Sequence, residues 1–400
     1  MASEPDFAAL PARVLVAGGG IAALELVVAL RELAGDRVAI ELLAPGDDLV
    51  YQPLLVAEPF GAGASHRFPL DELLAGLDAT HRPGTLAELR ADAHEAISAD
   101  GETLPYDAVG LAVGARALPA LDGALTFGGP ADVAPFQALV ERLEGGELRR
   151  VVFALPDETR SWPLPLYELA LMTAARVPAA EVLLVTPEAA PLALFGPAGS
   201  DAVSARLVAA GVELHTGARA EAFEDGAVRL AGGGSIAADA AVALPILDVP
   251  PLPGVPQGEH GFVPVDGLGR VADLADVYAA GDATDFPVKQ GGVAVRQAQA
   301  VASCIAARSG APARPEPFQP VLRGMMLTGT APSYLESAAG ESQTADSPLW
   351  WPPTKIADSY LVPYLLARFR LAVTGGEGLV DLVSSAPAGE RVRARPGRSQ

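Results

Sequence analysis

The sequence predicts an α/β fold of two doubly wound units, with a small C-terminal subdomain after them. Residues 13–33, RVLVAGGGIAALELVVALREL, read as a buried strand, a glycine turn and an apolar helix. Residues 150–243 repeat this outline of strands alternating with helices. Such alternation builds parallel sheets covered by helices, so the two stretches predict two tandem Rossmann-like domains.

The elements of each unit can be placed in order. In the first unit, a second strand is expected at residues 38–45, VAIELLAP, and a meander then leads to a returning strand that ends near Gly114. The second unit begins with the strands VVFAL and EVLLVTP. It continues with a helix near 198–210, a strand at 211–217, a hairpin around Asp225 and a strand at 240–245.

A proline-rich stretch at residues 244–261 leads from the second unit to a further strand and helix at residues 276–307. After Pro312 the pattern becomes irregular, which predicts a small appended subdomain. The expected bounds are residues 1–117 and 245–310 for the two parts of the first domain, 118–244 for the second domain, and 311–400 for the C-terminal subdomain and tail.

The composition argues against several functions. The chain carries 28 Lys and Arg against 49 Asp and Glu, a formal charge of -21, and so negative a surface repels nucleic acid and anionic lipid. The arginine-rich end, residues 391–400, is expected to be a solvated tail. The five histidines show no ligand spacing, so no metal is expected. Neither a secretory signal nor a long apolar run is visible, so we expect a cytoplasmic protein.

Gly18, Gly20 and Ala23 form a G-x-G-x-x-A motif between the first strand and its helix. Gly18 permits the tight turn, Gly20 lets the backbone approach a pyrophosphate, and the small Ala23 lets the helix pack on the strand. The N–H groups at the helix start, near Ile21 and Ala22, would face the phosphates. An ordinary glycine turn is the alternative, but the strand before the motif and the helix after it favour dinucleotide binding.

One part of this motif is missing. A carboxylate at the end of the second strand usually holds the ribose hydroxyls. That place falls on Ala44, and Glu41 stands three residues too early. The adenosine ribose must therefore be held in another way.

Residues 276–292, DVYAAGDATDFPVKQGG, resemble a segment of the pyridine nucleotide-disulfide oxidoreductase superfamily, the flavoproteins with two dinucleotide-binding domains. The likeness is greatest to sulfide:quinone oxidoreductases, flavocytochrome c sulfide dehydrogenases and type II NADH dehydrogenases. It implies a bound FAD in a discontinuous FAD domain. It further implies that Gly281 and Asp282 lie at the ribityl chain and pyrophosphate, and that Lys289, Gln290, Gly291 and Gly292 cap the pyrimidine edge of the flavin.

Two more stretches resemble the same superfamily. Residues 106–117, YDAVGLAVGARA, are similar to its YDxLxxATG segment and match it at Tyr106, Asp107 and Gly114. Residues 51–55, YQPLL, resemble the loop that packs under the isoalloxazine ring. The complete set of residues expected to contact FAD is Gly18, Gly20, Ile21, Ala22, Ala23, Pro53, Leu86, Ala112, Gly114, Gly281, Asp282, Lys289, Gln290, Gly291 and Gly292.

Lys289 is the candidate for tuning the flavin. An ammonium group and a helix N-terminus beside the ring stabilise its anionic reduced form and raise its reduction potential. No residue has a spacing that identifies a general base, so the catalytic residues stay unassigned.

The first turn of the second unit contains no glycine. It reads ALPDETRSWPLPLYE, residues 154–168, where NADH-oxidising members of the superfamily carry a second glycine-rich loop. Pro156 and Pro163 offer no N–H to a phosphate, and Asp157 and Glu158 would repel one. The bulk of the neighbouring Leu155 and Trp162 also opposes close backbone approach. NAD(P)H binding in the usual manner is therefore disfavoured.

The chain cannot use the thiol chemistry of its relatives either. Sulfide:quinone oxidoreductases take up sulfur with two or three cysteines, whereas this sequence has one. Cys304 lies in the helix after the flavin segment and is expected to be a buried packing residue.

The C-terminal region offers two further candidate segments. Trp350, Trp351, Lys355 and Tyr360 fall where relatives build a quinone pocket or a membrane-contacting tail, although plain packing against the flavin domain is favoured. Residues 361–373, LVPYLLARFRLAV, have an apolar face but are short and contain a proline, which argues only weakly for an interfacial anchor.

Glu168 is a candidate in the second unit. Together with Tyr167 it could face the flavin from the second unit's first helix, and a solvated helix position is an equally good interpretation.

The sequence thus predicts an FAD-dependent oxidoreductase that passes two electrons from an unknown donor through FAD to an acceptor, with a quinone as one candidate. Its partners would be small molecules, and a homodimer and peripheral contact at the membrane inner face are left open. One alternative is an NAD(P)H:acceptor reductase that binds nicotinamide in a nonstandard way. Another is a non-catalytic flavin-binding or electron-transfer protein.

Overall fold

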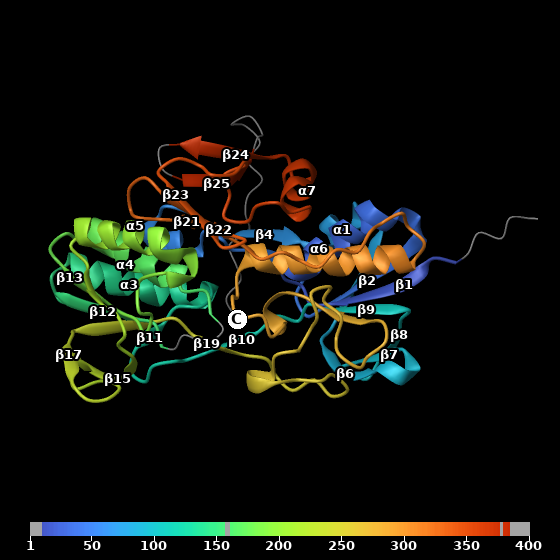
Figure 1. Cartoon of the computed structure of the whole chain (residues 1–400), viewed down its shortest axis with the longest axis horizontal. Helices are drawn as coiled ribbons and strands as arrows, with labels where there is room; N and C mark the ends of the chain where they lie inside the picture. Colours follow the sequence, from blue (N-terminus) through green and yellow to red (C-terminus); the bar gives the residue numbers. More distant parts are fainter. Residues whose placement is uncertain (1–9, 157–160, 377–378, 385–400) are drawn as a thin grey trace, which may run out of the picture.

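The computed structural model describes residues 10–156, 161–376 and 379–384. Two lobes lie side by side, and the C-terminal segment runs across both of them (Figure 1). Asp157, Glu158 and the arginine-rich tail fall outside the described residues.

A five-stranded parallel sheet in the order β20-β9-β1-β2-β5 forms the centre of the first lobe. Val14 and Val16 of β1 point into one core with helices α1 and α6, while Leu15 and Ala17 point into another beneath the meander β6–β8. The lobe thus has three layers. Its elements are β1 (Ala12–Ala17), α1 (Ile21–Ala34), β2 (Val38–Ala44), β5 (Ala79–Pro83), β6 (Leu86–Arg90), β7 (Glu95–Ser98), β8 (Thr103–Pro105), β9 (Ala108–Leu111), β20 (Val277–Ala279) and α6 (Gly291–Arg308).

Four short elements complete the first lobe. A two-stranded hairpin of β3 (Asp48–Tyr51) and β4 (His66–Pro69) encloses the 3-10 helix η2 (Leu55–Phe60), and α2 (Leu70–Ala75) follows. Helix α1 is buried continuously from Ala22 to Leu30 because the sheet, α6 and the C-terminal helix α7 (Leu361–Arg368) all pack on it. This explains why α1 is apolar nearly all round.

The second lobe repeats the architecture with the parallel sheet β11-β18-β12-β13-β14. Val151 and Phe153 of β12 face helices, whereas Val152 and Ala154 face the small sheet β15–β17. Its elements are β11 (Leu125–Thr126), α3 (Val133–Glu144), β12 (Arg150–Ala154), α4 (Leu164–Arg176), β13 (Glu181–Val185), α5 (Gly196–Ala209), β14 (Glu213–His215), β15 (Ala220–Glu224), β16 (Ala227–Leu230), β17 (Ser235–Ala237) and β18 (Ala240–Ala243).

The chain passes between the lobes twice. Strand β10 (Arg116–Leu118) leaves the first lobe and pairs antiparallel with β19 (Ile246–Asp248), which returns to it. The first lobe is therefore assembled from two separate stretches of sequence, and the expected α/β fold with two doubly wound lobes is confirmed.

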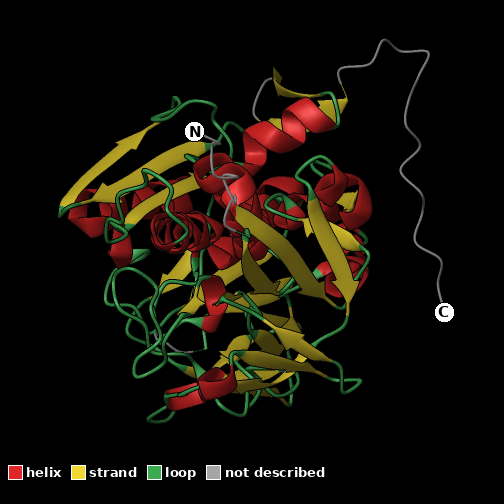
Figure 2. Cartoon of the chain, turned by 90° about the vertical axis from the view of Figure 1, so that its right-hand side faces the viewer, coloured by secondary structure: helices red, strands yellow, loops and turns green. Residues whose placement is uncertain are grey.

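The C-terminal segment packs into both lobes. Met325 and Trp350 lie in the second-lobe core, whereas Leu361 and Leu365 lie in the first-lobe core. Figure 2 shows most helices gathered in a layer with strands on both sides. This arrangement agrees with the packing of β21 on α4 and α6. The elements are β21 (Val321–Met326), β22 (Ser333–Ala338), β23 (Glu341–Ala345), α7 (Leu361–Arg368), β24 (Leu371–Gly376) and β25 (Leu379–Ser384).

Candidate functional site

A cavity of about 450 Å³ lies between the lobes. Ala112 and Ala280, which follow β9 and β20 of the first sheet, line it, as do Phe127 and Leu244, which follow β11 and β18 of the second sheet. Both sheets thus turn their carboxyl edges, where doubly wound folds bind ligands, toward the same space.

The glycine turn after β1 fits a dinucleotide. Gly18 has φ +128°, and a Cβ there would stand 2.0 Å from the carbonyl oxygen of Ala112, so only glycine is tolerated. Gly20 has no other described atom within 4 Å of its Cβ position and lines the cavity. The open approach to the backbone and the first turn of the 14-residue α1 form a suitable cradle for a pyrophosphate.

Asp282 lines the cavity from a turn whose backbone is fixed by two hydrogen bonds. The N–H of Gly281 donates to Gln297 Oε1 at 2.8 Å, and the Thr284 hydroxyl donates to the Gly281 carbonyl at 2.9 Å. The Asp282 carboxylate makes no hydrogen bond to the described part of the chain, and burial raises its pKa while Lys289 opposes that rise. A rigidly mounted carboxylate of this kind suits the hydroxyl groups of a ribityl chain.

The first turn of α6 also lines the cavity. Gln290 is the N-cap residue, and its Oε1 is buried without a hydrogen-bond partner. Lys289 is buried, donates to the Thr284 carbonyl oxygen and lies 3.9 Å from the centroid of the Phe262 ring. The 18-residue helix therefore presents its N-terminus and one buried cation to the cavity.

Most residues expected at FAD lie around this cavity. Gly18, Ala23 and Gly292 belong to the same two turns but do not line it, and Leu86 packs in the core beneath β6–β8. The expected residues that line the cavity are Gly20, Ile21, Ala22, Pro53, Ala112, Gly114, Gly281, Asp282, Lys289, Gln290 and Gly291.

Two carboxylates named in the sequence analysis, the matched Asp107 and the unmatched Glu41, have structural partners. Asp107 accepts hydrogen bonds from the backbone N–H and guanidinium of Arg13, at the opposite end of β1 from the cavity. Glu41, which stands three residues before the position expected for the ribose carboxylate, pairs with Arg82 of β5 at 2.9 Å. Ala44, which occupies that position, is fully buried. Neither carboxylate lines the cavity.

The glycine-free turn of the second lobe lines the same cavity. Ser161, Trp162 and Pro165 are among its wall residues, and the backbone N–H of Lys289 donates to the Ser161 carbonyl at 3.3 Å. Pro163 and Pro165 lie at the start of α4, so this helix offers fewer N–H donors than a phosphate-binding N-terminus. The described part of this turn therefore forms one wall of the cavity.

Glu168 is buried on the cavity wall, so the interpretation as a solvated helix position is wrong. Its side chain is 1 % exposed and pairs with Lys355 Nζ at 2.6 and 2.8 Å, and both residues line the cavity. Glu168 also accepts the Leu327 N–H at 2.9 Å. Burial raises the pKa of the Glu168 carboxyl, and the Lys355 ammonium opposes the rise. Tyr167 points away and donates to Glu188.

The aromatic residues of the C-terminal segment divide between packing and exposure. Trp350 is buried edge-on against Tyr334, as the packing interpretation expects, whereas Trp351 is 83 % exposed. The side chains of Leu361 and Leu365 of α7 pack in the first-lobe core. None of the helices in the described ranges is long and apolar enough to cross a bilayer.

The chain's cysteine does not line this cavity. Cys304 is buried in α6, as expected, and burial raises the pKa of its thiol. Within the residues that the structure covers, no group of three or more His, Cys, Asp or Glu side chains could hold a metal ion.

Part of the chain matches a known protein family. Residues 167–301 match the family model described as pyridine nucleotide-disulphide oxidoreductase. No curated protein sequence matches the chain.

Solved structures share the fold. A sulfide:quinone oxidoreductase from Aquifex aeolicus superposes with a TM-score of 0.74 at 17 % identity, over 84 % of this chain and 87 % of that one. A ferredoxin reductase from Rhodopseudomonas palustris gives 0.64 at 22 % identity, over 83 % and 84 %. A putidaredoxin reductase–putidaredoxin complex gives 0.62 at 18 % identity, over 82 % of each chain. Residues 167–301 thus match the pyridine nucleotide-disulphide oxidoreductase model, and the whole chain shares the fold of these solved oxidoreductase and reductase structures.

Proposed function

We propose that this protein passes two electrons from a donor through FAD to a quinone that enters the same cavity from the second-lobe side. The observation that carries the proposal is the composition of that side. Its walls are largely apolar, and a buried ion pair, Glu168–Lys355, lies among them. A flat, apolar molecule with a polar oxygen is the kind of acceptor that such a wall selects.

The first-lobe side would hold FAD. Gly20 and the first turn of α1 would receive the pyrophosphate, Asp282 the ribityl hydroxyls, and the first turn of α6 the pyrimidine edge of the ring. When bound, FAD supplies the two-electron redox chemistry that no side chain of this protein can supply.

The second-lobe side would hold and protonate the acceptor. Reduction of a quinone to a hydroquinone adds two electrons and two protons, and Lys355 Nζ holds a proton beside the cavity. Lys355 would donate a hydrogen bond to a quinone oxygen and then one of these two protons. The other proton would come from the reduced FAD together with the electrons, and water would reprotonate Lys355. The Glu168 carboxylate, 2.6 Å from Nζ, orients the lysine side chain until then.

The structure also supports a donor other than NAD(P)H. The second lobe's turn packs over the cofactor cavity, and prolines occupy the start of α4. Anaerobic mixing of the FAD-loaded protein with NADH or NADPH is therefore expected to leave the flavin band unchanged over seconds. Fast bleaching by either would refute this part and support a reductase that binds nicotinamide in a nonstandard way.

Quinone reduction can be tested without knowing the donor. The FAD-loaded protein is photoreduced anaerobically and mixed with a short-chain benzoquinone. We expect the oxidised flavin spectrum to return on the time scale of a rapid-mixing experiment. Repeated cycles of photoreduction and reoxidation would also argue against a non-catalytic binding protein. Reoxidation no faster than that of free reduced FAD would contradict the proposal.

Lys289→Met is expected to lower the reduction potential of the bound flavin. The buried ammonium favours the anionic reduced ring, and its loss removes that stabilisation. For a two-electron couple, about 30 mV corresponds to about 1.4 kcal/mol, and we expect a decrease of that order. Potentiometric titration measures it, and an unchanged potential would remove Lys289 from the tuning residues.

A further inference from the structure

We propose that Asp358 is a positioning residue that holds the segment Thr354–Asp358, here called the strap, across the start of α6 so that Lys355 reaches Glu168. The inference rests on the proposed function, because it concerns the same cavity. It goes beyond that function in assigning a role to residues that do not line the cavity.

The strap begins on a buried anchor. The indole N–H of Trp350 donates to the Thr354 carbonyl at 2.9 Å, and the Thr354 hydroxyl donates to the Ile356 carbonyl at 2.7 Å. Trp350 is itself packed in the second-lobe core. The start of the strap is thus fixed to the second lobe.

The strap then crosses the first turn of α6. A Cβ at Gly291 would lie 3.0 Å from the Ile356 Cδ1 atom, so glycine at this position leaves room for the strap. Lys355 and Ile356 both line the cavity. The register of the strap on α6 therefore determines where the Lys355 ammonium lies.

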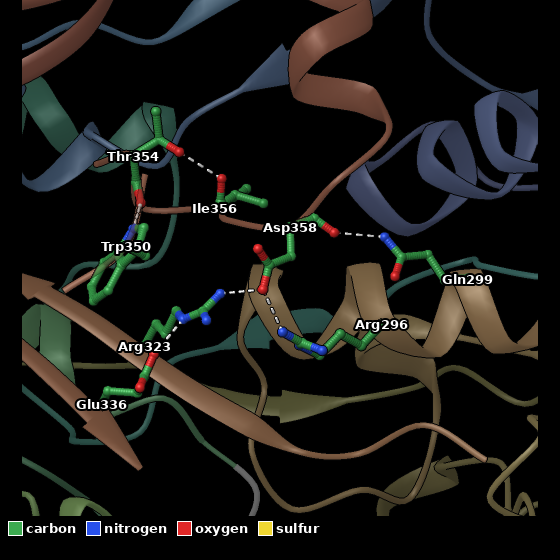
Figure 3. A network of polar contacts seen from close by, with 8 residues as sticks. All are labelled: Arg296, Gln299, Arg323, Glu336, Trp350, Thr354, Ile356 and Asp358. Carbon is green, nitrogen blue, oxygen red and sulfur yellow. Dashed lines mark hydrogen bonds and ion pairs between the residues drawn. The ribbon is translucent and has the colours of Figure 1, made fainter. Parts of the chain in front are cut away.

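Asp358 fixes that register from outside the cavity (Figure 3). Its carboxylate pairs with Arg296 of α6 at 2.6 Å and with Arg323 of β21, and its carbonyl accepts the Gln299 amide at 2.7 Å. Arg323 continues to Glu336 of β22 at 2.6 Å. One carboxylate thus joins the strap to a helix and to a strand, with two arginines held on the same oxygen.

After Asp358, a second set of hydrogen bonds holds the chain to α1. Glu25 of α1 is fully buried and accepts the backbone N–H groups of Tyr360 and Leu361 at 2.8 and 2.9 Å. Loss of Asp358's charge should therefore loosen the strap between two intact anchors, without releasing α7.

The position of the strap determines whether the Lys355 ammonium group faces the Glu168 carboxylate. The groups against the Glu168 carboxylate are Lys355 Nζ from the strap and the Leu327 N–H beyond β21. The other charged side chains on the cavity wall are Asp282, Lys289 and Arg323. Glu168 is buried, so withdrawal of Lys355 would raise its pKa, and the acid limb of quinone reduction would move to higher pH.

Asp358→Asn tests this directly. Asp358 has φ +55°, a conformation that asparagine tolerates, so the variant removes the charge with little backbone strain. We expect amide exchange in residues 354–358 to become about fivefold faster, and the acid limb of flavin reoxidation by a benzoquinone to shift toward that of Lys355→Met. Arg296→Gln, which removes one partner of Asp358, should act in the same direction.

Glu336→Gln is the matched control. It breaks the other ion pair of Arg323 and leaves the strap contacts in place, so exchange in the strap and the acid limb should stay as in the unmodified protein. Unchanged exchange and pH profile in both Asp358→Asn and Arg296→Gln would overturn the inference, as would equal shifts in the control. Failure of the unmodified protein to be reoxidised by quinone would instead reject the proposed function, while the exchange measurement would still decide whether Asp358 holds the strap.

Discussion

Lys355→Met is expected to lower the free energy of unfolding by about 3–5 kcal/mol at pH 8, because it leaves the Glu168 carboxylate buried without its cation. The same variant should reoxidise with benzoquinone about 100-fold more slowly, since Lys355 would no longer offer a proton to the acceptor. Chemical denaturation and stopped-flow absorbance measure the two effects separately.

The pH dependence of this loss has a definite sign. Burial holds the pKa of Glu168 above its unfolded value, and the folded protein binds a proton there more readily than the unfolded chain. Without Lys355 this pKa is higher still, so the stability defect of Lys355→Met should be fully present above the pKa that Glu168 has in the variant, and should diminish as the pH falls through that pKa and the carboxyl becomes neutral. A defect that grows on acidification would contradict the assignment.

The double variant Glu168→Gln/Lys355→Met provides the control. Removing both charges leaves no buried unpaired ion, so the double variant should be more stable than Lys355→Met alone. It should nevertheless remain slow with benzoquinone. Additive losses of stability would show that the two side chains do not act as a pair.

Gly18→Ala is the second change with a large expected effect. The added Cβ would stand 2.0 Å from the Ala112 carbonyl oxygen in a backbone conformation with φ +128°. The strained conformation alone costs about 1–3 kcal/mol. We expect a lower melting temperature and purification without FAD.

Gly20→Ala separates cofactor binding from folding. Gly20 has an ordinary φ of -91°, and its added Cβ would meet no other described atom within 4 Å. It would instead project into the cavity, where the pyrophosphate is proposed to lie. The apoprotein should melt close to the unmodified one, while FAD affinity falls at least about tenfold. Normal FAD binding by this variant would remove the α1 turn from the pyrophosphate site.

Local sequence patterns predicted the lobes well because their elements follow strong rules. The glycine turn at Gly18 and Gly20, the continuous apolar run of β1 and the repeat after residue 150 all have a local physical cause. The expected helix at 198–210 corresponds to α5, Gly196–Ala209. The hairpin β3–β4 and the sheet β21–β23 were not predicted, because neither has a clear alternation of apolar residues.

The polar half of the site could not be predicted in this way. Glu168 and Lys355 are 187 residues apart, and only the path of the C-terminal segment across both lobes brings them together. A weak signal was available, since Lys355 is one of two lysines in 400 residues. The two lysines, Lys289 and Lys355, both line the cavity.

The most direct test of the central claim, that one cavity serves both FAD and the acceptor, is an experimental structure of the protein with FAD and a benzoquinone analogue. The account predicts the flavin between Gly20, Asp282 and the start of α6, with a quinone oxygen within hydrogen-bond distance of Lys355 Nζ. An analogue bound outside this cavity, or a flavin away from α1 and α6, would contradict it.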